Sequence, residues 1–400
     1  MPDAAVYDYD MYLDPELLRD PHERVRGLLR DAPPVFWTPR NNGHWMAVSH
    51  SAVTEVMRDW ERFSNELMPP EKMSALMAML PADFPHIPQP KPITLDPPSH
   101  TKYRSALTRA FAPKSMMALS DQIQTLAASL IDAVVDDGHC DFITAVAEPL
   151  PVLVFLKMMG LPQDRLGEFR RLVHVMMSPA DDESAGPQRM RMIADAIKDV
   201  IVARRDDPQD DLISLLWSSE IDGEPMTMEV MEDFAVLLFI AGLDTVINAI
   251  GFAVRHMAAH PDMQESLRAD QSRIVETVEE MLRRYSIVSP PRRVAKDTEL
   301  AGWSLKRNDL ITPVLPGAML DPGHWPSPEL VDIGREDRAH FTFGAGPHRC
   351  LGSHLARIEL QTLYGEVLNR LPPFRLDPDK PAVFGAGVIF TVASLPIRWD

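Results

Sequence analysis

Residues 340–352 read His-Phe-Thr-Phe-Gly-Ala-Gly-Pro-His-Arg-Cys-Leu-Gly, a glycine-rich loop that ends close to a single cysteine, Cys350. Gly344 and Gly346 permit backbone conformations that other residues avoid, and they let the main chain approach a bulky group closely. After Gly352, apolar residues recur at helical spacing until two prolines end the pattern. Cys350 is therefore expected where a loop enters a helix, a position at which free amide groups favour a thiolate over a thiol.

Three interpretations of this loop are open on its residues alone. Cys350 could be a buried, inert cysteine that only fills space in a glycine loop. A phosphate-binding loop fits poorly, because no Lys-Ser or Lys-Thr pair follows the glycines. A lone thiolate held by flexible backbone against a large flat group is also the arrangement of an axial haem ligand.

Composition narrows the class of protein. The formal net charge of −18 argues against nucleic acid or an anionic membrane as the main partner. Cys140 and Cys350 are the only cysteines, too few for a disulfide framework or a structural zinc site. Residues 1–8 lack the basic and apolar regions of a signal peptide, and the strongest apolar run, 234–243, is too short to span a bilayer. We therefore expect a cytoplasmic protein without a membrane segment.

Residues 68–98 differ in character from the rest of the chain. They contain nine prolines interleaved with four methionines. Proline-rich sequence without periodicity predicts a long loop, and such loops often act as lids, for which methionine supplies a pliable apolar lining. A surface linker is the alternative, although linkers are rarely this apolar. A second irregular stretch, the polar segment 178–188, is predicted to be a mobile connection.

The segment Asp-Pro-Pro-Ser at 96–99 is expected to start a helix that carries His100 and Arg104. Residues four apart lie on the same face of a helix, so this pair could clamp a carboxylate. A solvated surface pair is the alternative on these residues alone. Glu280 and Arg283 form a similar i,i+3 pair in a later predicted helix, and such pairs are common solvated decoration.

An uninterrupted helix is predicted from Thr227 to His260, where Pro261 follows, and its middle is apolar almost all round, as in a helix buried in a large protein. A carboxylate such as Asp244 is costly there unless it is paired or functional. Gly242 weakens the helix, and the Thr245 hydroxyl can bond a carbonyl one turn back. Together these residues predict a local groove with a proton donor beside it. A helix kink with a capped Asp244 is the alternative.

The three patterns together resemble those of the cytochrome P450 superfamily. They are Ala-Gly-x-Asp-Thr at 241–245, Glu-x-x-Arg at 280–283 and Phe-Gly-x-Gly-x-His-x-Cys-x-Gly at 343–352. The resemblance covers nearly the whole chain, and segments 241–248 and 395–400 are similar to those of bacterial camphor hydroxylases and related terpenoid-oxidising enzymes. It implies a mainly α, single-domain P450 fold over residues 1–400, a helical triangular prism with a smaller β-rich region, in a monomer.

The resemblance also implies roles for individual residues around haem b. Cys350 would be the axial thiolate and so the iron ligand, while Asp244 and Thr245 would handle protons on the oxygen side, with Arg170 as the partner of Asp244. Glu280, Arg283 and Arg335 would form a structural network. Four residues would hold the haem propionates: His100, Arg104, Arg292 (with Arg293 as the alternative) and His348.

The implied activity is that of a monooxygenase, which inserts one oxygen atom of O2 into a C–H bond. The sequence has no flavin or nicotinamide fingerprint, so electrons are expected from an acidic ferredoxin and its NAD(P)H-dependent reductase. The ferredoxin would dock on a locally basic face that includes Lys102, Arg104, Arg109 and Arg349. A haem-based sensor or a peroxide-driven peroxygenase are rival readings, but neither needs the Asp244–Thr245 pair.

By the same resemblance, the substrate pocket is expected to be small and apolar, with residues 68–98 as its roof. Camphor hydroxylase holds its ketone with a tyrosine in the lid, whereas Phe84 and His86 are the only aromatic-type residues of this lid. We expect a compact monoterpenoid such as 1,8-cineole or a camphor-like bicycle, or a norisoprenoid. The alternative is a tailoring P450 that acts on a larger natural product. The expected lining residues are Leu237, Ile240, Ala241, Val288, Val388 and Ile389.

Overall fold

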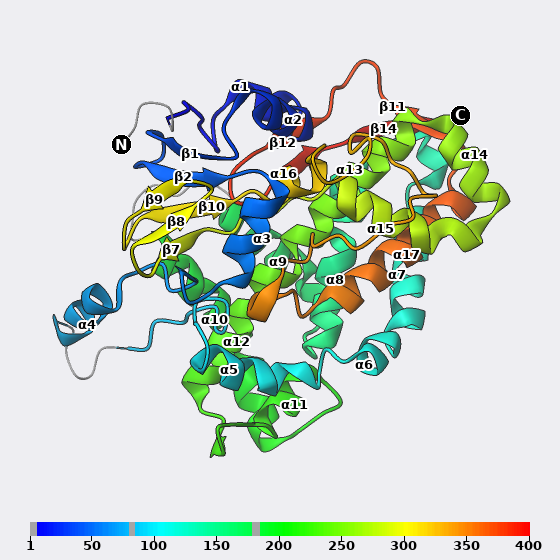
Figure 1. The fold of residues 1–400 in the computed structure, drawn as a ribbon. Coiled ribbons are helices and arrows are strands. Elements are labelled where there is room, and N and C mark those ends of the chain that lie inside the picture. The colour runs from blue at the N-terminus through cyan, green and yellow to red at the C-terminus, as the bar shows by residue number, and fades with distance from the viewer. Residues whose placement is uncertain (1–5, 80–84, 178–184) are drawn as a thin grey trace.

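The computed structural model describes residues 6–79, 85–177 and 185–400, and 53% of the chain is helical, which confirms the mainly α class (Figure 1). Most helices form one side of the molecule, and most strands gather near the N-terminal segment. The helices are α1 (Pro15–Arg19), α2 (Pro21–Asp31), α3 (His50–Arg58), α4 (Pro70–Met79), α5 (Ser99–Thr108), α6 (Pro113–Met117), α7 (Ser120–Asp132), α8 (Pro149–Met158), α9 (Leu166–Met177), α10 (Ala185–Asp206), α11 (Leu212–Trp217), α12 (Met228–Gly242), α13 (Asp244–Ala259), α14 (Pro261–Ala269), α15 (Ile274–Arg284), α16 (Leu315–Leu320) and α17 (Ser353–Arg370).

The largest sheet has five strands in the order β1-β2-β10-β7-β3, and its pairs are antiparallel except for the parallel pair β10–β2. A second sheet has the order β11-β14-β4, and three two-stranded ribbons complete the β structure. The strands are β1 (Val35–Thr38), β2 (His44–Ala47), β3 (Phe63–Ser64), β4 (His139–Asp141), β5 (Glu220–Ile221), β6 (Glu224–Pro225), β7 (Arg292–Val294), β8 (Thr298–Leu300), β9 (Trp303–Leu305), β10 (Leu310–Pro313), β11 (Phe374–Leu376), β12 (Val383–Gly385), β13 (Thr391–Ser394) and β14 (Pro396–Trp399).

The long helix predicted from Thr227 to His260 is present but interrupted. The Thr227 side chain accepts a hydrogen bond from the amide of Val230 and so caps α12, while Leu243, with φ of −103° and ψ of −65°, lies between α12 and α13 and belongs to neither helix. By length and composition the span Met228–Ala259 could cross a membrane, but 67% of its most apolar window is buried inside the protein. Core packing therefore accounts for its apolar surface.

The proline-rich segment was predicted to be a loop throughout. This is wrong for residues 70–79, which form α4. Pro70 occupies the first helical position, where the fixed φ of proline suits the helix and its missing amide is not needed. Residues 85–98 contain no helix or strand, in agreement with the prediction for that part. Phe84 and most of the predicted connection at 178–188 lie outside the described residues, and residues 185–188 belong to α10.

Candidate active site

The loop around Cys350 is held by its own backbone. The Cys350 amide donates to the Phe343 carbonyl at 2.7 Å, and Gly344 and Gly346 have φ values of +75° and +69°. A Cβ atom on Gly346 would lie 2.8 Å from the carbonyl oxygen of Met57 at the end of α3. Glycine is therefore required there by both conformation and space. Because α17 begins three residues after Cys350, the predicted loop-to-helix junction is confirmed.

The surroundings of the Cys350 thiol differ from the prediction. The residue is exposed, yet protein atoms crowd the thiol, and this burial raises its pKa more than the Gly352 amide and three nearby arginines lower it. Desolvation thus outweighs the amides and the positive charges that were expected to favour a thiolate. A metal cation in contact with the sulfur would reverse this balance, because a coordinating thiol loses its proton.

Four basic side chains that lie far apart in the sequence meet beside this loop. The ring centroids of His100 and His348 are 4.1 Å apart, and Arg292 and Arg104 both lie close enough to lower the pKa of His348. Burial is the main cause of that shift and lowers the pKa to about 2, and it lowers the pKa of His100 to about 4. The sequence placed His100 and Arg104 on one helix face, and the fold adds Arg292 from β7 and His348 from the cysteine loop.

Among the described residues, no carboxylate forms a hydrogen bond or ion pair with this cluster, and Asp96 is near enough only to raise the pKa of His100 and of Arg292 slightly against the effect of burial. Both ring nitrogens of His100 and Nε2 of His348 are buried without a hydrogen-bond partner among the same residues. Within the described part of the chain, the guanidinium of Arg292 donates only to the carbonyls of Pro290 and Pro291 and to the Met57 sulfur, and burial lowers its pKa to about 10. Unpaired buried donors of this kind fit a ligand that carries carboxylates, as haem b does in its two propionates.

Arg293, the alternative to Arg292, is engaged elsewhere. Its Nε donates to the Glu66 carbonyl at 2.6 Å, and its other nitrogens contact Asn308 and Ser64. Neighbouring residues of a strand point to opposite faces, so only one of the two arginines can face the histidine cluster. Of the two, Arg292 is the one that lies near His348.

At the interruption between α12 and α13, the Thr245 hydroxyl donates to the Ala241 carbonyl at 3.2 Å, the bond that was predicted from the sequence. The Asn248 side chain donates to the Asp244 carbonyl at 2.8 Å. The Asp244 carboxyl has a buried oxygen without a partner among the described residues, and burial raises its pKa to about 6. Asp244 is thus able to hold and release a proton near neutral pH.

Arg170 is not the partner of Asp244, and that expectation is wrong. Its guanidinium donates to the Glu148 carboxylate at 2.9 Å and to the Thr144 carbonyl at 3.2 Å. Glu148 is buried at the start of α8, where an uncompensated charge would be costly. The need to compensate the buried charge of Glu148 accounts for the position of Arg170.

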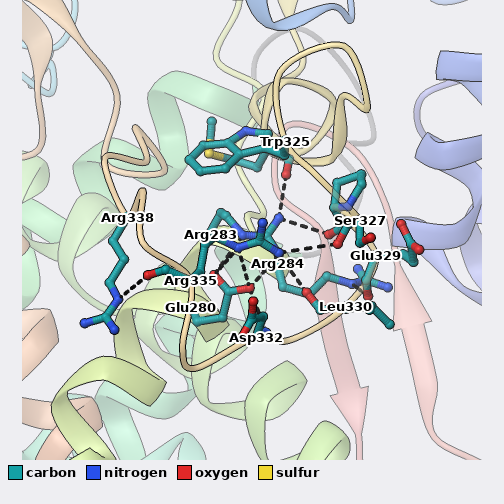
Figure 2. Close-up of polar contacts among 12 residues, drawn as sticks. Glu280, Arg283, Arg284, Trp325, Ser327, Glu329, Leu330, Asp332, Arg335 and Arg338 are labelled. Atoms are coloured by element: carbon teal, nitrogen blue, oxygen red, sulfur yellow. Dashed lines mark hydrogen bonds and ion pairs between the residues drawn. The ribbon is translucent and has the colours of Figure 1, made fainter.

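Glu280, Arg283 and Arg335 form the network that the resemblance implied (Figure 2). Arg283 donates to Glu280 at 2.8 and 2.9 Å, and Arg335 does so at 3.1 Å. Arg283 also donates to the carbonyls of Met319, Pro328 and Leu330. Because Glu280 and Arg283 are only 2% and 1% exposed, the interpretation of this pair as solvated decoration is wrong.

Two groups of residues were missed by the sequence reasoning. Arg357 in α17 donates to the Glu279 carboxylate at 2.6 Å. Burial raises the pKa of Glu279, but the hydrogen bonds and charges of Arg357 and His340 outweigh it and lower the pKa to about 2. Asp233 in α12 is completely buried and holds part of the proline-rich segment. Its signal was present, because the cost of a carboxylate in an apolar helix applies to Asp233 as much as to Asp244.

The expected substrate residues come from two places. Val288 forms an isolated antiparallel bridge with Ile389, and the Ser289 amide donates to the Val388 carbonyl at 2.7 Å, which brings these C-terminal residues beside the end of α15. Leu237, Ile240 and Ala241 lie on the last turns of α12, just before Thr245. All except Ala241 belong to, or pack against, the same apolar core.

The basic residues expected to meet a redox partner are only partly free. Lys102 pairs with Asp222 in the turn between β5 and β6, and Arg104 donates to the Arg349 carbonyl at 2.6 Å. The residues Arg109 and Arg349 are exposed. The available positive charge is thus smaller than the sequence suggested.

A family model described as "Cytochrome P450" matches residues 169–383. The "Probable cytochrome P450 127A1" of Sinorhizobium fredii is 31% identical over 412 residues, which cover 100% of this chain and 96% of the relative. The chain belongs to the cytochrome P450 family. Among solved structures, CYP101J2 has a TM-score of 0.88 at 33% identity and CYP101C1 has 0.89 at 30% identity, each with 100% of this chain and 98% of the other covered.

This P450 is therefore a monooxygenase that uses haem b, O2 and redox partners. When bound, the haem iron supplies the chemistry of dioxygen activation, and the protein supplies the axial ligand, the pocket and the protons. The family membership favours the monooxygenase over the haem-based sensor that the sequence left open.

Proposed function

We propose that this P450 hydroxylates a compact apolar terpenoid, with electrons from an acidic ferredoxin and its NAD(P)H-dependent reductase. The observation that carries the substrate class is the apolar, uncharged character of the residues that would line the pocket. They lie on α12 and at the bridge between Val288 and Ile389. Such a site holds its ligand by burial, at about 25 cal/mol per Å² of apolar surface. The enzyme would act as a single-domain monomer in the cytoplasm.

In this proposal Cys350 ligates the haem iron, and the basic cluster holds the propionates. Those carboxylates would supply the partners that the buried nitrogens of His100 and His348 lack among the described residues. Arg104 and Arg292 would add charge-assisted hydrogen bonds. The pairing explains why two histidines and two arginines from distant parts of the chain are placed together.

Protons would reach the oxygen side through the interrupted helix. Asp244 would take up a proton at its buried carboxyl, and its raised pKa keeps part of the population protonated near neutral pH. The Thr245 hydroxyl, oriented by the Ala241 carbonyl, would pass a proton to the reacting oxygen. In this proposal Asp244 takes up the proton and the adjacent Thr245 delivers it.

The lid supports a ligand without strong polar anchoring. His86 is the one aromatic-type residue in the described part of the lid, and its Nε2 already contacts Asp233 at 2.8 Å. A ring committed to a buried carboxylate is a poor donor for a substrate ketone. This favours a cyclic ether such as 1,8-cineole over camphor. An ionone, although itself a ketone, is included in the proposal because its apolar ring and chain can be held by burial.

Ligand titrations monitored by the haem spin state test the substrate class. The purified holoenzyme is mixed with 1,8-cineole, camphor and an ionone, and each low-spin to high-spin shift is recorded. We expect larger shifts and tighter binding for the cyclic ether and the ionone. Tight camphor binding with a full shift, and none from the other two, would overturn the choice.

A larger natural product is the second candidate. The "Polyketide biosynthesis cytochrome P450 PksS" of Bacillus subtilis is 32% identical over 70% of this chain and 70% of the relative. A macrolide included in the same titrations separates the two candidates. A macrolide that shifts the spin state more completely than any terpenoid would favour the tailoring role.

The ferredoxin would dock beside the cysteine loop, near Arg109 and Arg349. An acidic partner is steered to such a site by charge, and salt screens this attraction. We expect the rate of reduction by an acidic ferredoxin to fall steeply as ionic strength rises. A rate that does not change with salt would contradict a charge-steered partner.

A further inference from the structure

Two adjacent acidic residues lie in the buried part of α12. Glu232 is 4% exposed and Asp233 is 0% exposed. A buried charge is costly unless opposite charges and hydrogen bonds compensate it. Both carboxylates are compensated, and the compensating groups come from outside α12.

Asp233 binds the described part of the proline-rich segment at three points. Its Oδ1 accepts hydrogen bonds from His86 Nε2 and from the Gln89 amide, both at 2.8 Å. Lys91 Nζ lies 2.9 Å from Oδ2, an ion pair whose angle is poor for a hydrogen bond. One side chain thus fixes residues 86–91 against α12, although this segment has no helix or strand of its own.

Glu232 adds α10 to the same junction. Arg191 Nη2 donates to Glu232 at 2.7 Å and to the His86 carbonyl at 2.9 Å, and Lys198 Nζ lies 3.6 Å from the other Glu232 oxygen. Residues 85–98 pass beside α10 and α12 before α5 begins (Figure 1). Three parts of the chain therefore meet at the two carboxylates.

Asp233 lies one turn before Leu237 and two turns before Ile240, on the same side of α12. We propose that Asp233 is a positioning residue that holds residues 86–91 over the substrate-binding side of α12 and so sets how fast ligands enter and leave. The inference rests on the proposed substrate pocket. It assigns to a buried carboxylate, rather than to apolar contacts, the control of ligand access.

The test compares the holoenzyme with its Asp233→Asn variant. The amide keeps the shape of the side chain and an acceptor for the Gln89 amide, but it loses the charge that pairs with Lys91 and His86. We expect amide hydrogen exchange in residues 86–91 to become faster. We also expect a phenylimidazole bound to the haem iron to dissociate at least about tenfold faster, in line with the loss of a buried ion pair, with a smaller effect on carbon monoxide.

Glu229→Gln is the matched control, because Glu229 is an exposed acid one turn earlier on the same helix. This variant should leave exchange and dissociation rates unchanged. Lys91→Met should reproduce part of the Asp233→Asn effect, and the two changes together should be less than additive. Lys91→Met also serves if the Asp233 variant does not fold.

Unchanged exchange in residues 86–91, or phenylimidazole and carbon monoxide rates raised by the same factor, would overturn the proposal. A purely structural role for Asp233 would lower thermal stability without any dependence on ligand size. Phenylimidazole and carbon monoxide report access to the haem whatever the natural substrate is. A failure of the terpenoid proposal would therefore leave this test valid.

Discussion

The two cysteines occupy contrasting surroundings, and a pair of substitutions separates their roles. Cys140 lies in β4, where it pairs with Ile397 of β14, and burial raises its pKa to about 12. It is thus a structural thiol in a strand. Cys350 is exposed in the glycine loop and accessible to a ligand.

Cys350→His should abolish the absorbance band of the reduced carbon monoxide complex from which the family takes its name, because that band depends on a thiolate ligand. Monooxygenase turnover should be lost with it. Cys140→Ser should leave both intact. A Cys140 variant that loses the band would refute the assignment of Cys350 as the iron ligand.

Substitutions of Thr245 and of Asp244 should affect the products differently, which separates the roles of the two residues in proton transfer. Thr245→Ala should still consume reductant and oxygen but release mainly peroxide, because without the hydroxyl the second proton reaches the wrong position or arrives too late. Asp244→Asn should slow turnover by roughly 10²–10⁴-fold, the range for a lost general acid–base group. Peroxide yield and product yield per reductant consumed are the measurements. Full coupling in Thr245→Ala would contradict its role.

The Asp244 pKa of about 6 has a further consequence at this scale. A raised carboxyl pKa means that the folded state holds the proton more tightly than the unfolded state. The carboxyl therefore loses this proton across pH 6 in the folded protein. Below about pH 6 Asp244 should remain mostly protonated, so a plot of turnover rate against pH should change slope near pH 6.

At the scale of the element, the last turns of α12 face the substrate in our proposal, so the volume of Ile240 should select ligands by size. Ile240→Phe should reduce the pocket and weaken the larger ligands first, because overpacking is costly where space is short. Ile240→Val is the matched control and should not show this order. The dissociation constants of a series of terpenoids of increasing size, measured by spin shift, check the prediction. An equal loss for all sizes would place Ile240 outside the pocket.

At the scale of the whole molecule, buried neutral histidines should make the fold sensitive to acid. His22 packs edge-on against Phe252, its Nε2 donates to the Ser286 carbonyl at 2.8 Å, and its Nδ1 is buried without a partner among the described residues. Burial, followed by the charge of Arg284, lowers its pKa to about 3. As the pH falls, His22 therefore binds a proton in the unfolded chain before it does so in the folded protein. The free energy of unfolding consequently falls as the pH drops below about 6.5.

For His22 alone the loss between pH 7 and pH 5 should be about 2 kcal/mol. His22→Gln should remove this acid-dependent part, even if the variant is less stable at pH 7. His139→Gln, at an exposed histidine of β4, is the control and should leave the pH dependence as it is. Urea unfolding of the holoenzyme at the two pH values, followed by circular dichroism, measures the difference. An unchanged acid loss in His22→Gln would show that other groups dominate.

The sequence by itself determined the features that depend on neighbours along the chain. The loop-to-helix junction at Cys350, the Thr227 cap and the bond from Thr245 to the Ala241 carbonyl follow from local backbone and side-chain chemistry. The family motifs, each short and continuous, added the cofactor and the reaction.

Only the tertiary structure decided the pairings between distant residues. It placed Arg292 rather than Arg293 beside His100 and His348, and it gave Arg170 to Glu148 instead of Asp244. It also turned Cys350 into a thiol whose pKa burial raises. The physical reason is the same in each case, because desolvation and charge pairing depend on which segments the fold brings together, and spacing along the chain does not contain that information.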